Sequence, residues 1–203
     1  MDFKIVTIDD NMTVKEPFVQ NLRKHYKDAD CSHVFQKPDE GLKFVLDNLN
    51  SKMIVFIDWN FSGCKQKGID LLKEIRKKTS LLYIVMMSAN QLRTDIPLEA
   101  IIEMMNEENF FYLDRSNSDF ETTISIVDKI RSQWTTKFDC VLEQWLVRHP
   151  EDNVKEAFSE ASTGKTYTWA DILVELRQQT PVGKSFEQKL NEYYIYQLNR
   201  SKK

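Results

Sequence analysis

The sequence has only three cysteines among its 203 residues, Cys31, Cys64 and Cys140, and they lie far apart. None belongs to a C-x-x-C pair or stands at zinc-ligand spacing from a histidine, so the pattern predicts neither a disulfide framework nor a zinc site. Scattered free thiols are typical of proteins in a reducing compartment. We therefore expect a cytoplasmic protein.

The chain also lacks the features that direct a protein to a membrane. Its N-terminus, MDFKIVTIDD, has neither a positively charged start nor a long apolar run, so no signal peptide is predicted. No apolar stretch approaches the roughly 18 residues that a membrane span requires. We expect a soluble protein without a membrane partner.

An excess of basic residues, which dominates nucleic-acid affinity, is missing as well. Residues 1–140 hold 19 Lys and Arg against 22 Asp and Glu, and residues 141–203 hold nine of each. This balance argues against DNA binding by either half of the chain. The sequence shows no internal repeat and no low-complexity segment.

What the sequence does contain is enough apolar material for a sizeable core. Apolar residues make up 41% of the chain, with twelve Phe and four Trp. A chain of this length has room for one ordinary domain and a smaller second one. We predict a first domain over residues 1–136 and a second over residues 137–203.

The first domain alternates apolar runs with amphipathic stretches. The predicted strands cover residues 3–8, 32–35, 53–57, 81–87 and 110–113. The predicted helices lie over residues 14–26, 38–49, 69–75, 97–106 and 120–134. Strands that are apolar nearly throughout and alternate with helices indicate a parallel sheet covered on both faces. The predicted fold class is therefore α/β, a doubly wound five-stranded parallel sheet of flavodoxin-like type.

In such a sheet the ligand crevice lies beyond the carboxyl ends of the strands. The residues that follow the predicted strands are Asp9, Asp10, Asp58, Ser88 and Arg115. Three carboxylates brought together repel one another unless a cation lies between them, and oxygen-only ligands suit Mg²⁺. The strand ends therefore predict a magnesium site that also holds a hydroxyl and a fixed cation.

Four motifs in this order resemble those of the receiver domain of two-component response regulators. They are IDD at residues 8–10, FIDWN at 56–60, MMSAN at 86–90 and YLDRS at 112–116. The FIDWN segment is similar to the phosphorylation site of the chemotaxis response regulator. The resemblance covers residues 3 to about 134, the whole of such a domain.

The resemblance implies a role for each residue at this edge. Asp58 is the phosphoacceptor, and Asp10, Asp58 and the backbone carbonyl of Asn60 hold Mg²⁺ with help from Asp9 through water. Ser88 hydrogen-bonds the phosphoryl group together with the Arg115 cation. Tyr112 changes rotamer when Ser88 moves toward it. The partner that supplies the phosphoryl group is a sensor histidine kinase or a phosphotransfer protein.

The sequence departs from the family pattern at two places. The cation of the last strand is normally Lys followed by Pro, and here it is Arg115 followed by Ser116. Arginine is a planar fork rather than a compact ammonium, so this exchange is not conservative. The loop after Asp58 also lacks the proline of the family and places Gly68 about two residues farther along.

After residue 138 the strand signals stop, and the remaining pattern predicts a small all-α domain. Thr168 to Asp171 is a variant of a capping box, and Thr180 followed by Pro181 indicates the start of the last helix. We find no resemblance to a known output domain. Aromatic residues at helical spacing favour a module that binds a further protein partner over a DNA-binding helix-turn-helix.

The leading hypothesis is a response regulator phosphorylated on Asp58, with no enzymatic activity of its own. The first alternative is a transcriptional response regulator whose helical half binds DNA, and the second is a pseudo-receiver scaffold that is never phosphorylated. A hydrolase of the related fold is less well supported, because such enzymes usually carry a second acid where this chain has Asn60. The sequence leaves open whether the protein forms a homodimer.

Overall fold

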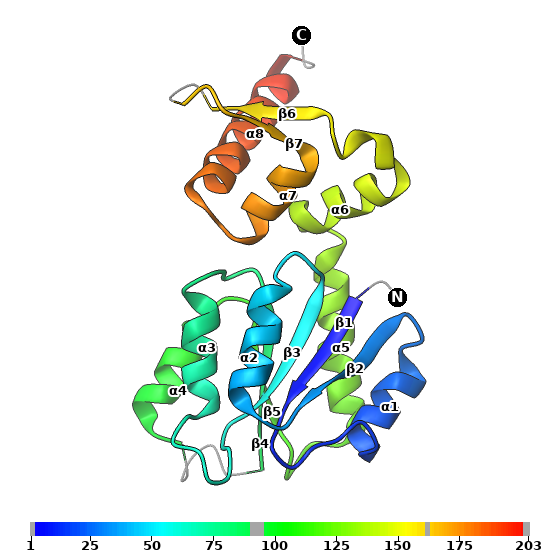
Figure 1. Ribbon diagram of the computed structural model, residues 1–203, viewed down its shortest axis with the longest axis vertical. Helices are drawn as coiled ribbons and strands as arrows, with labels where there is room; N and C mark the ends of the chain where they lie inside the picture. Colours follow the sequence, from blue (N-terminus) through cyan, green and yellow to red (C-terminus); the bar gives the residue numbers. More distant parts are fainter. Residues whose placement is uncertain (1–2, 90–95, 161–162, 201–203) are drawn as a thin grey trace. The chain divides into compact units, whose positions relative to one another are not determined.

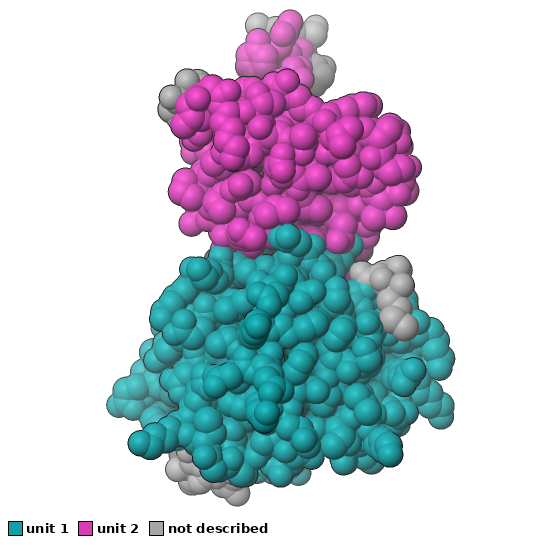
Figure 2. Space-filling view, viewed as in Figure 1, with its two compact units in different colours: residues 1–133 teal, residues 134–203 magenta. Residues whose placement is uncertain are grey.

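The computed structural model describes residues 3–89, 96–160 and 163–200. The chain divides into two compact units, residues 1–133 and 134–203 (Figure 2). The division falls between Gln133 and Trp134, whereas the sequence predicted a boundary after residue 136. Asn90 of the MMSAN motif lies outside the described residues.

The first unit is built on a five-stranded parallel sheet with the order β2-β1-β3-β4-β5 (Figure 1). The strands are β1 (Phe3–Ile8), β2 (Ala29–Phe35), β3 (Met53–Asp58), β4 (Tyr83–Ser88) and β5 (Phe110–Asp114). The predicted doubly wound sheet is confirmed. The prediction for the second strand was too short, because it began at Ser32 instead of Ala29.

The helices of this unit cover both faces of the sheet (Figure 1). They are α1 (Pro17–His25), α2 (Pro38–Asp47), α3 (Gly68–Arg76), α4 (Leu98–Met105) and α5 (Phe120–Trp134). Residues of α2, α3 and α4 share one buried cluster with alternate residues of the strands, such as Val55 and Ile57. On the other face the Phe18 ring of α1 meets the Phe56 ring of β3, with their centroids 5.4 Å apart.

The apolar character of the central strands follows from this double cover. In β3 the first five residues are buried, although their side chains point alternately to opposite faces. A strand with one wet face would alternate apolar and polar residues instead. The uninterrupted run from Met53 to Ile57 therefore reports a sheet with helices on both sides.

The second unit packs helices against a short hairpin. It contains α6 (Phe138–Arg148), a 3₁₀ turn (Pro150–Asp152), β6 (Glu156–Ser159), β7 (Thr166–Thr168), α7 (Trp169–Arg177) and α8 (Pro181–Arg200). Its buried cluster includes Leu146, Tyr167, Ile172, Leu176 and Phe186. No helix in the described ranges combines the length and the apolar character that a bilayer span needs.

The helical character of this unit is confirmed, but the all-α expectation needs one correction. β6 and β7 form a two-stranded antiparallel sheet that the sequence did not predict. The two strands have four and three residues, and Tyr167 is the only fully buried residue among them. Strands this short carry too few residues for an alternating pattern to stand out.

Both predicted helix starts in this unit are confirmed. The Thr168 side chain accepts the N–H of Asp171, and the Asp171 carboxylate accepts the N–H of Thr168 at 2.9 Å. At the start of α8, the Gly183 N–H donates to the Thr180 hydroxyl at 3.1 Å. These contacts satisfy backbone donors that a helix N-terminus otherwise leaves unpaired.

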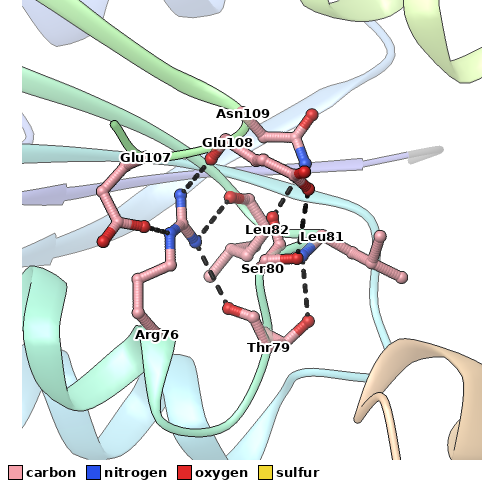
Figure 3. Close-up of polar contacts among 8 residues, drawn as sticks. All are labelled: Arg76, Thr79, Ser80, Leu81, Leu82, Glu107, Glu108 and Asn109. Carbon is pink, nitrogen blue, oxygen red and sulfur yellow. Dashed lines mark hydrogen bonds and ion pairs between the residues drawn. The ribbon is translucent and has the colours of Figure 1, made fainter. Parts of the chain in front are cut away.

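Arg76 connects two loops at the amino ends of β4 and β5 (Figure 3). Its Nε donates to a carboxylate oxygen of Glu107 at 2.8 Å, and its Nη2 donates to the carbonyl of Glu108 at 2.7 Å. Its Nη1 donates to the carbonyls of Thr79 and Leu82. One buried guanidinium therefore satisfies acceptors from both loops, and only 8% of its side chain is exposed.

We predict that Arg76→Met lowers the free energy of unfolding by about 3 kcal/mol, because the partly buried Glu107 carboxylate and several carbonyls lose their donor. Urea unfolding followed by circular dichroism measures the change. The matched control is Lys77→Met, which removes an exposed ion pair with Glu74 and should cost less than about 0.5 kcal/mol. Equal losses in the two variants would contradict a structural role for the Arg76 contacts.

Candidate functional site: the acidic edge of the sheet

Three carboxylates meet at the carboxyl edge of the sheet, as the sequence predicted. Asp9 and Asp10 directly follow β1, and Asp58 is the last residue of the neighbouring strand β3. One carboxylate oxygen from each lies within 4.8 Å of the others. The parallel pairing of β1 with β3 brings these residues together, since it matches Ile8 with Ile57 one position before the acids.

Asp9 is buried, and each of its carboxylate oxygens accepts a hydrogen bond. Its Oδ1 accepts the backbone N–H of Asn11 at 2.8 Å, and its Oδ2 accepts Nη1 of Arg115 at 2.6 Å. Only 1% of the Asp9 side chain is exposed, whereas 36% of the Arg115 side chain is. The predicted fixed cation thus reaches the site, where it neutralises the buried carboxylate.

Asp10 is held by neutral donors instead. Its Oδ2 accepts the backbone N–H of Ser62 at 2.8 Å, and its Oδ1 accepts the side-chain amide of Asn11 at 3.1 Å. Ser62 belongs to the loop that follows Asp58. This loop is therefore tied to the end of β1 through one carboxylate.

Asp58 is the carboxylate with the most perturbed proton affinity. Burial, followed by the negative charge of Asp9, raises the pKa of Asp58 to about 7. The positive charge of Arg115 opposes this rise. Near neutral pH, the loss of a proton from Asp58 is therefore finely balanced, and a cation that approaches the cluster stabilises the ionised carboxylate.

The loop after Asp58 is fixed by packing as well as by hydrogen bonds. Trp59 and Phe61 are buried, and the N–H of Gly68 donates to the carbonyl of Trp59 at 2.9 Å. Asn60, whose side chain is exposed, forms an isolated antiparallel bridge with Lys67. The backbone of Asn60 is therefore held in place, and its carbonyl as a metal ligand stays a prediction.

Ser88 and Tyr112 lie on neighbouring strands at the same edge. Ser88 ends β4 and is buried, and its carbonyl accepts the N–H of Arg115 at 2.8 Å. Burial raises the pKa of Tyr112, and a side-chain hydrogen bond from Ser88 partly opposes this rise. The two predicted switch residues are therefore in contact, while their switching role stays a prediction.

The donor set of this edge fits a magnesium ion. Three carboxylate groups and nearby backbone carbonyls are hard oxygen ligands, which Mg²⁺ prefers over nitrogen or sulfur. The raised pKa of Asp58, caused first by burial and then by the negative charge of Asp9, means that a bound cation would stabilise its ionised form. Asp9, Asp10 and Asp58 are the residues that could hold the ion.

Two residues at the site were missed by the sequence analysis. Asn11 contacts both Asp9 and Asp10, and its place directly after two aspartates is typical of a turn residue. Ser62 acts through its backbone N–H, so its side chain gives no signal in the sequence. Sequence patterns reveal side-chain chemistry, whereas the contact between the Ser62 N–H and Asp10 depends only on the backbone path of the loop after Asp58.

Comparison with known proteins supports the receiver fold. Two solved structures, each described as a two-component system response regulator/GGDEF domain protein, superpose with TM-scores of 0.51 and 0.50, both at 17% sequence identity. The matches cover 65% and 64% of this chain and 50% of each matched chain. A response regulator receiver domain from Clostridium thermocellum matches 66% of this chain and 99% of its own, with 24% identity and a TM-score of 0.47. Neither the family models nor the curated proteins gave a match.

We predict that Asp58→Asn stabilises the metal-free protein at pH 8 and not at pH 4. The folded-state pKa of Asp58 is raised from 3.8 to about 7, so the protonated carboxyl favours folding at low pH, and this contribution is lost as the pH rises through 7. Asparagine stays neutral throughout. Because the site is partly open to solvent, we expect a gain of about 1–2 kcal/mol above pH 7. Thermal unfolding in EDTA from pH 4 to pH 8 measures it.

Asp114→Asn is the control, because the pKa of Asp114 is lowered whereas that of Asp58 is raised. The Asp114 carboxylate at the end of β5 accepts hydrogen bonds from Asn117 and Ser116, which lower the pKa of this group. Its contribution to stability is therefore present above its ordinary pKa and is lost as the pH falls. A Tm difference for Asp58→Asn that does not change with pH would contradict the assignment.

We further predict that Gly68→Ala disturbs the site through a direct clash. A Cβ atom at Gly68 would lie 2.3 Å from the carbonyl oxygen of Asp58 and 2.7 Å from the sulfur of Met86. The cost should be about 2–3 kcal/mol in urea unfolding, as for other overpacked positions. Gly63→Ala in the same loop is the control. Its backbone has a positive φ of 70° but its Cβ meets nothing within 4 Å, so a loss of about 1 kcal/mol is expected. The opposite order of costs would show that backbone strain outweighs the clash.

Proposed function

We propose that the protein is a response regulator of a two-component phosphorelay, with Asp58 as its phosphoacceptor. The observation that carries this proposal is the position of Asp58 at the carboxyl end of β3, with oxygens of Asp9 and Asp10 within 4.8 Å. A receiver fold supplies the context, because its ligand crevice opens at this edge of the sheet. A sensor histidine kinase or a phosphotransfer protein would deliver the phosphoryl group.

In the proposed reaction, an oxygen of Asp58 forms a bond to phosphorus as the bond between phosphorus and the imidazole of the donor breaks. The product is an acyl phosphate, and the electron pair of the broken bond stays on the imidazole. A bound Mg²⁺ would neutralise the negative charges that approach one another in this step. Asp10, Asp58 and the carbonyl of Asn60 would hold the ion, with Asp9 acting through water.

Two further residues would stabilise the phosphoryl group. The Ser88 hydroxyl at the end of β4 would donate to a phosphoryl oxygen, and the Arg115 guanidinium could donate two parallel hydrogen bonds to two of them. Ser88 now hydrogen-bonds Tyr112, so a Ser88 hydroxyl that turns toward the phosphoryl group would give up that contact. This exchange would pass the chemical change at Asp58 to the surface of β5.

For the second unit we propose a protein-interaction module. Residues 134–203 hold ten basic and ten acidic residues, so the unit lacks the positive excess that DNA binding requires. In the second half of α8, five large apolar side chains are more than half exposed. They are Tyr193, Tyr194, Ile195, Tyr196 and Leu198. Tyrosine-rich apolar surface is typical of protein interfaces.

We predict that acetyl phosphate and Mg²⁺ add a single phosphate to the protein, and that Asp58→Asn abolishes the addition. An acyl phosphate is stable in acid and labile in base, so intact mass spectrometry before and after a brief alkaline treatment identifies it. Asp114→Asn, which changes an acid at the same edge without touching the cluster, should be phosphorylated as the unchanged protein is. No phosphate from several donors would favour the pseudo-receiver alternative.

A further inference from the structure

At the acidic edge, Arg115 forms its ion pair with Asp9 and not with Asp58. Its Nη1 lies 2.6 Å from Oδ2 of Asp9, and no cationic side chain in the described ranges forms an ion pair with Asp58. The cation therefore neutralises the most buried carboxylate of the three. Asp58, which is only partly buried, feels the charge of Arg115 without forming an ion pair with it.

This contact completes the coordination of Asp9. The other oxygen of Asp9 accepts the N–H of Asn11 at 2.8 Å, so each carboxylate oxygen has a strong donor. A charged and buried carboxylate is stabilised by such a partner, and its removal without a replacement is strongly unfavourable. A divalent cation that draws on Asp9, directly or through water, therefore competes with a guanidinium already bound to Oδ2.

Resting on the proposed function, we propose that Arg115 withholds Asp9 from a divalent cation, so that metal binding competes with the Arg115–Asp9 ion pair. At rest the ion would depend on Asp10 and Asp58. The competition is possible because the Arg115 side chain has room to move, whereas the Asp9 side chain does not. Asp9 is 1% exposed and fixed at the end of β1, whereas the Arg115 side chain is 36% exposed and can turn toward solvent.

Arginine suits this role better than the lysine expected at this position. Its guanidinium is longer and planar, and it carries five N–H donors in a fixed fork. It can therefore hold Asp9 through one nitrogen and present the others to a second anion. A lysine ammonium is a compact charge on a flexible four-carbon stem, without the planar fork, so it would keep the charge at the site but hold Asp9 less firmly.

The test measures Mg²⁺ affinity by isothermal titration calorimetry in three variants. Arg115→Met, which frees Asp9, should bind Mg²⁺ about tenfold more tightly than the unchanged protein, because it removes a nearby positive charge that repels the ion and competes for Asp9. Arg115→Lys keeps the net charge and should bind about threefold more tightly, because its contact with Asp9 is weaker. Lys65→Met removes an exposed charge from the loop after Asp58 and should change the affinity less than about twofold.

The three variants distinguish the effect of the Arg115–Asp9 contact on Mg²⁺ affinity from the effect of a nearby positive charge. If Arg115→Lys binds Mg²⁺ no more tightly than the unchanged protein, or if Lys65→Met gains as much as Arg115→Met, the Arg115–Asp9 contact does not control metal affinity and the inference is wrong. Circular dichroism at the titration temperature checks that each variant is folded. Should Arg115→Met fail to fold, the charge-conserving Arg115→Lys variant still decides the question.

The outcome is also separable from that of the proposed function. Tighter metal binding by the Arg115 variants, together with no phosphate on Asp58 from any donor, would support the competition and overturn the phosphorelay proposal. Phosphorylation of Asp58, together with unchanged metal affinity in both Arg115 variants, would support the phosphorelay proposal and overturn the competition. No Mg²⁺ binding by any of the proteins would overturn this inference and the metal part of the proposed function together.

Discussion

Repulsion among three carboxylates is the constraint on which the carboxyl edge of the sheet depends. Two unit charges about 4 Å apart near a protein surface cost about 4 kcal/mol, and here three acids lie within 4.8 Å. The protein offsets this cost differently at each residue. Arg115 neutralises Asp9, the donors of Asn11 and Ser62 stabilise Asp10, and the proton affinity of Asp58 rises. The three carboxylates therefore differ in their partners, which agrees with the proposed role of Asp58 as the phosphoacceptor.

These polar contacts are positioned by the hydrophobic core. The N–H of Ser62 reaches Asp10 only because Trp59 and Phe61 anchor the loop in the core on either side of Asn60. The close approach of Gly68 to the carbonyl of Asp58 sets where the loop ends and α3 begins. The apolar packing beneath this charged site therefore fixes the positions of its polar groups.

The sequence predicted most of the first unit, because its strands are long, apolar and regularly separated by helices. It also predicted that Asp9, Asp10 and Asp58 converge, since strand order and the shared edge follow from the parallel fold. It did not predict that Arg115 binds Asp9, because the partner of a flexible side chain depends on which oxygen lies within reach. The sequence also did not predict the backbone N–H of Ser62 as a donor, because any residue type supplies such a donor. It did not predict β6 and β7, because strands this short show no clear pattern of residue types.

Two arginines show how one residue type serves opposite ends of the same sheet. Arg76 is 8% exposed and its donors are spent on a carboxylate and on carbonyls from two loops, so it can only stabilise the fold. Arg115 is 36% exposed and, among the residues that the structure describes, forms an ion pair with Asp9 alone, so its fork could also donate to a second anion. A guanidinium that is fully satisfied fixes structure, whereas one that is partly satisfied can change partner. The proposed exchange of partners is therefore assigned to Arg115, the more exposed of the two guanidinium groups.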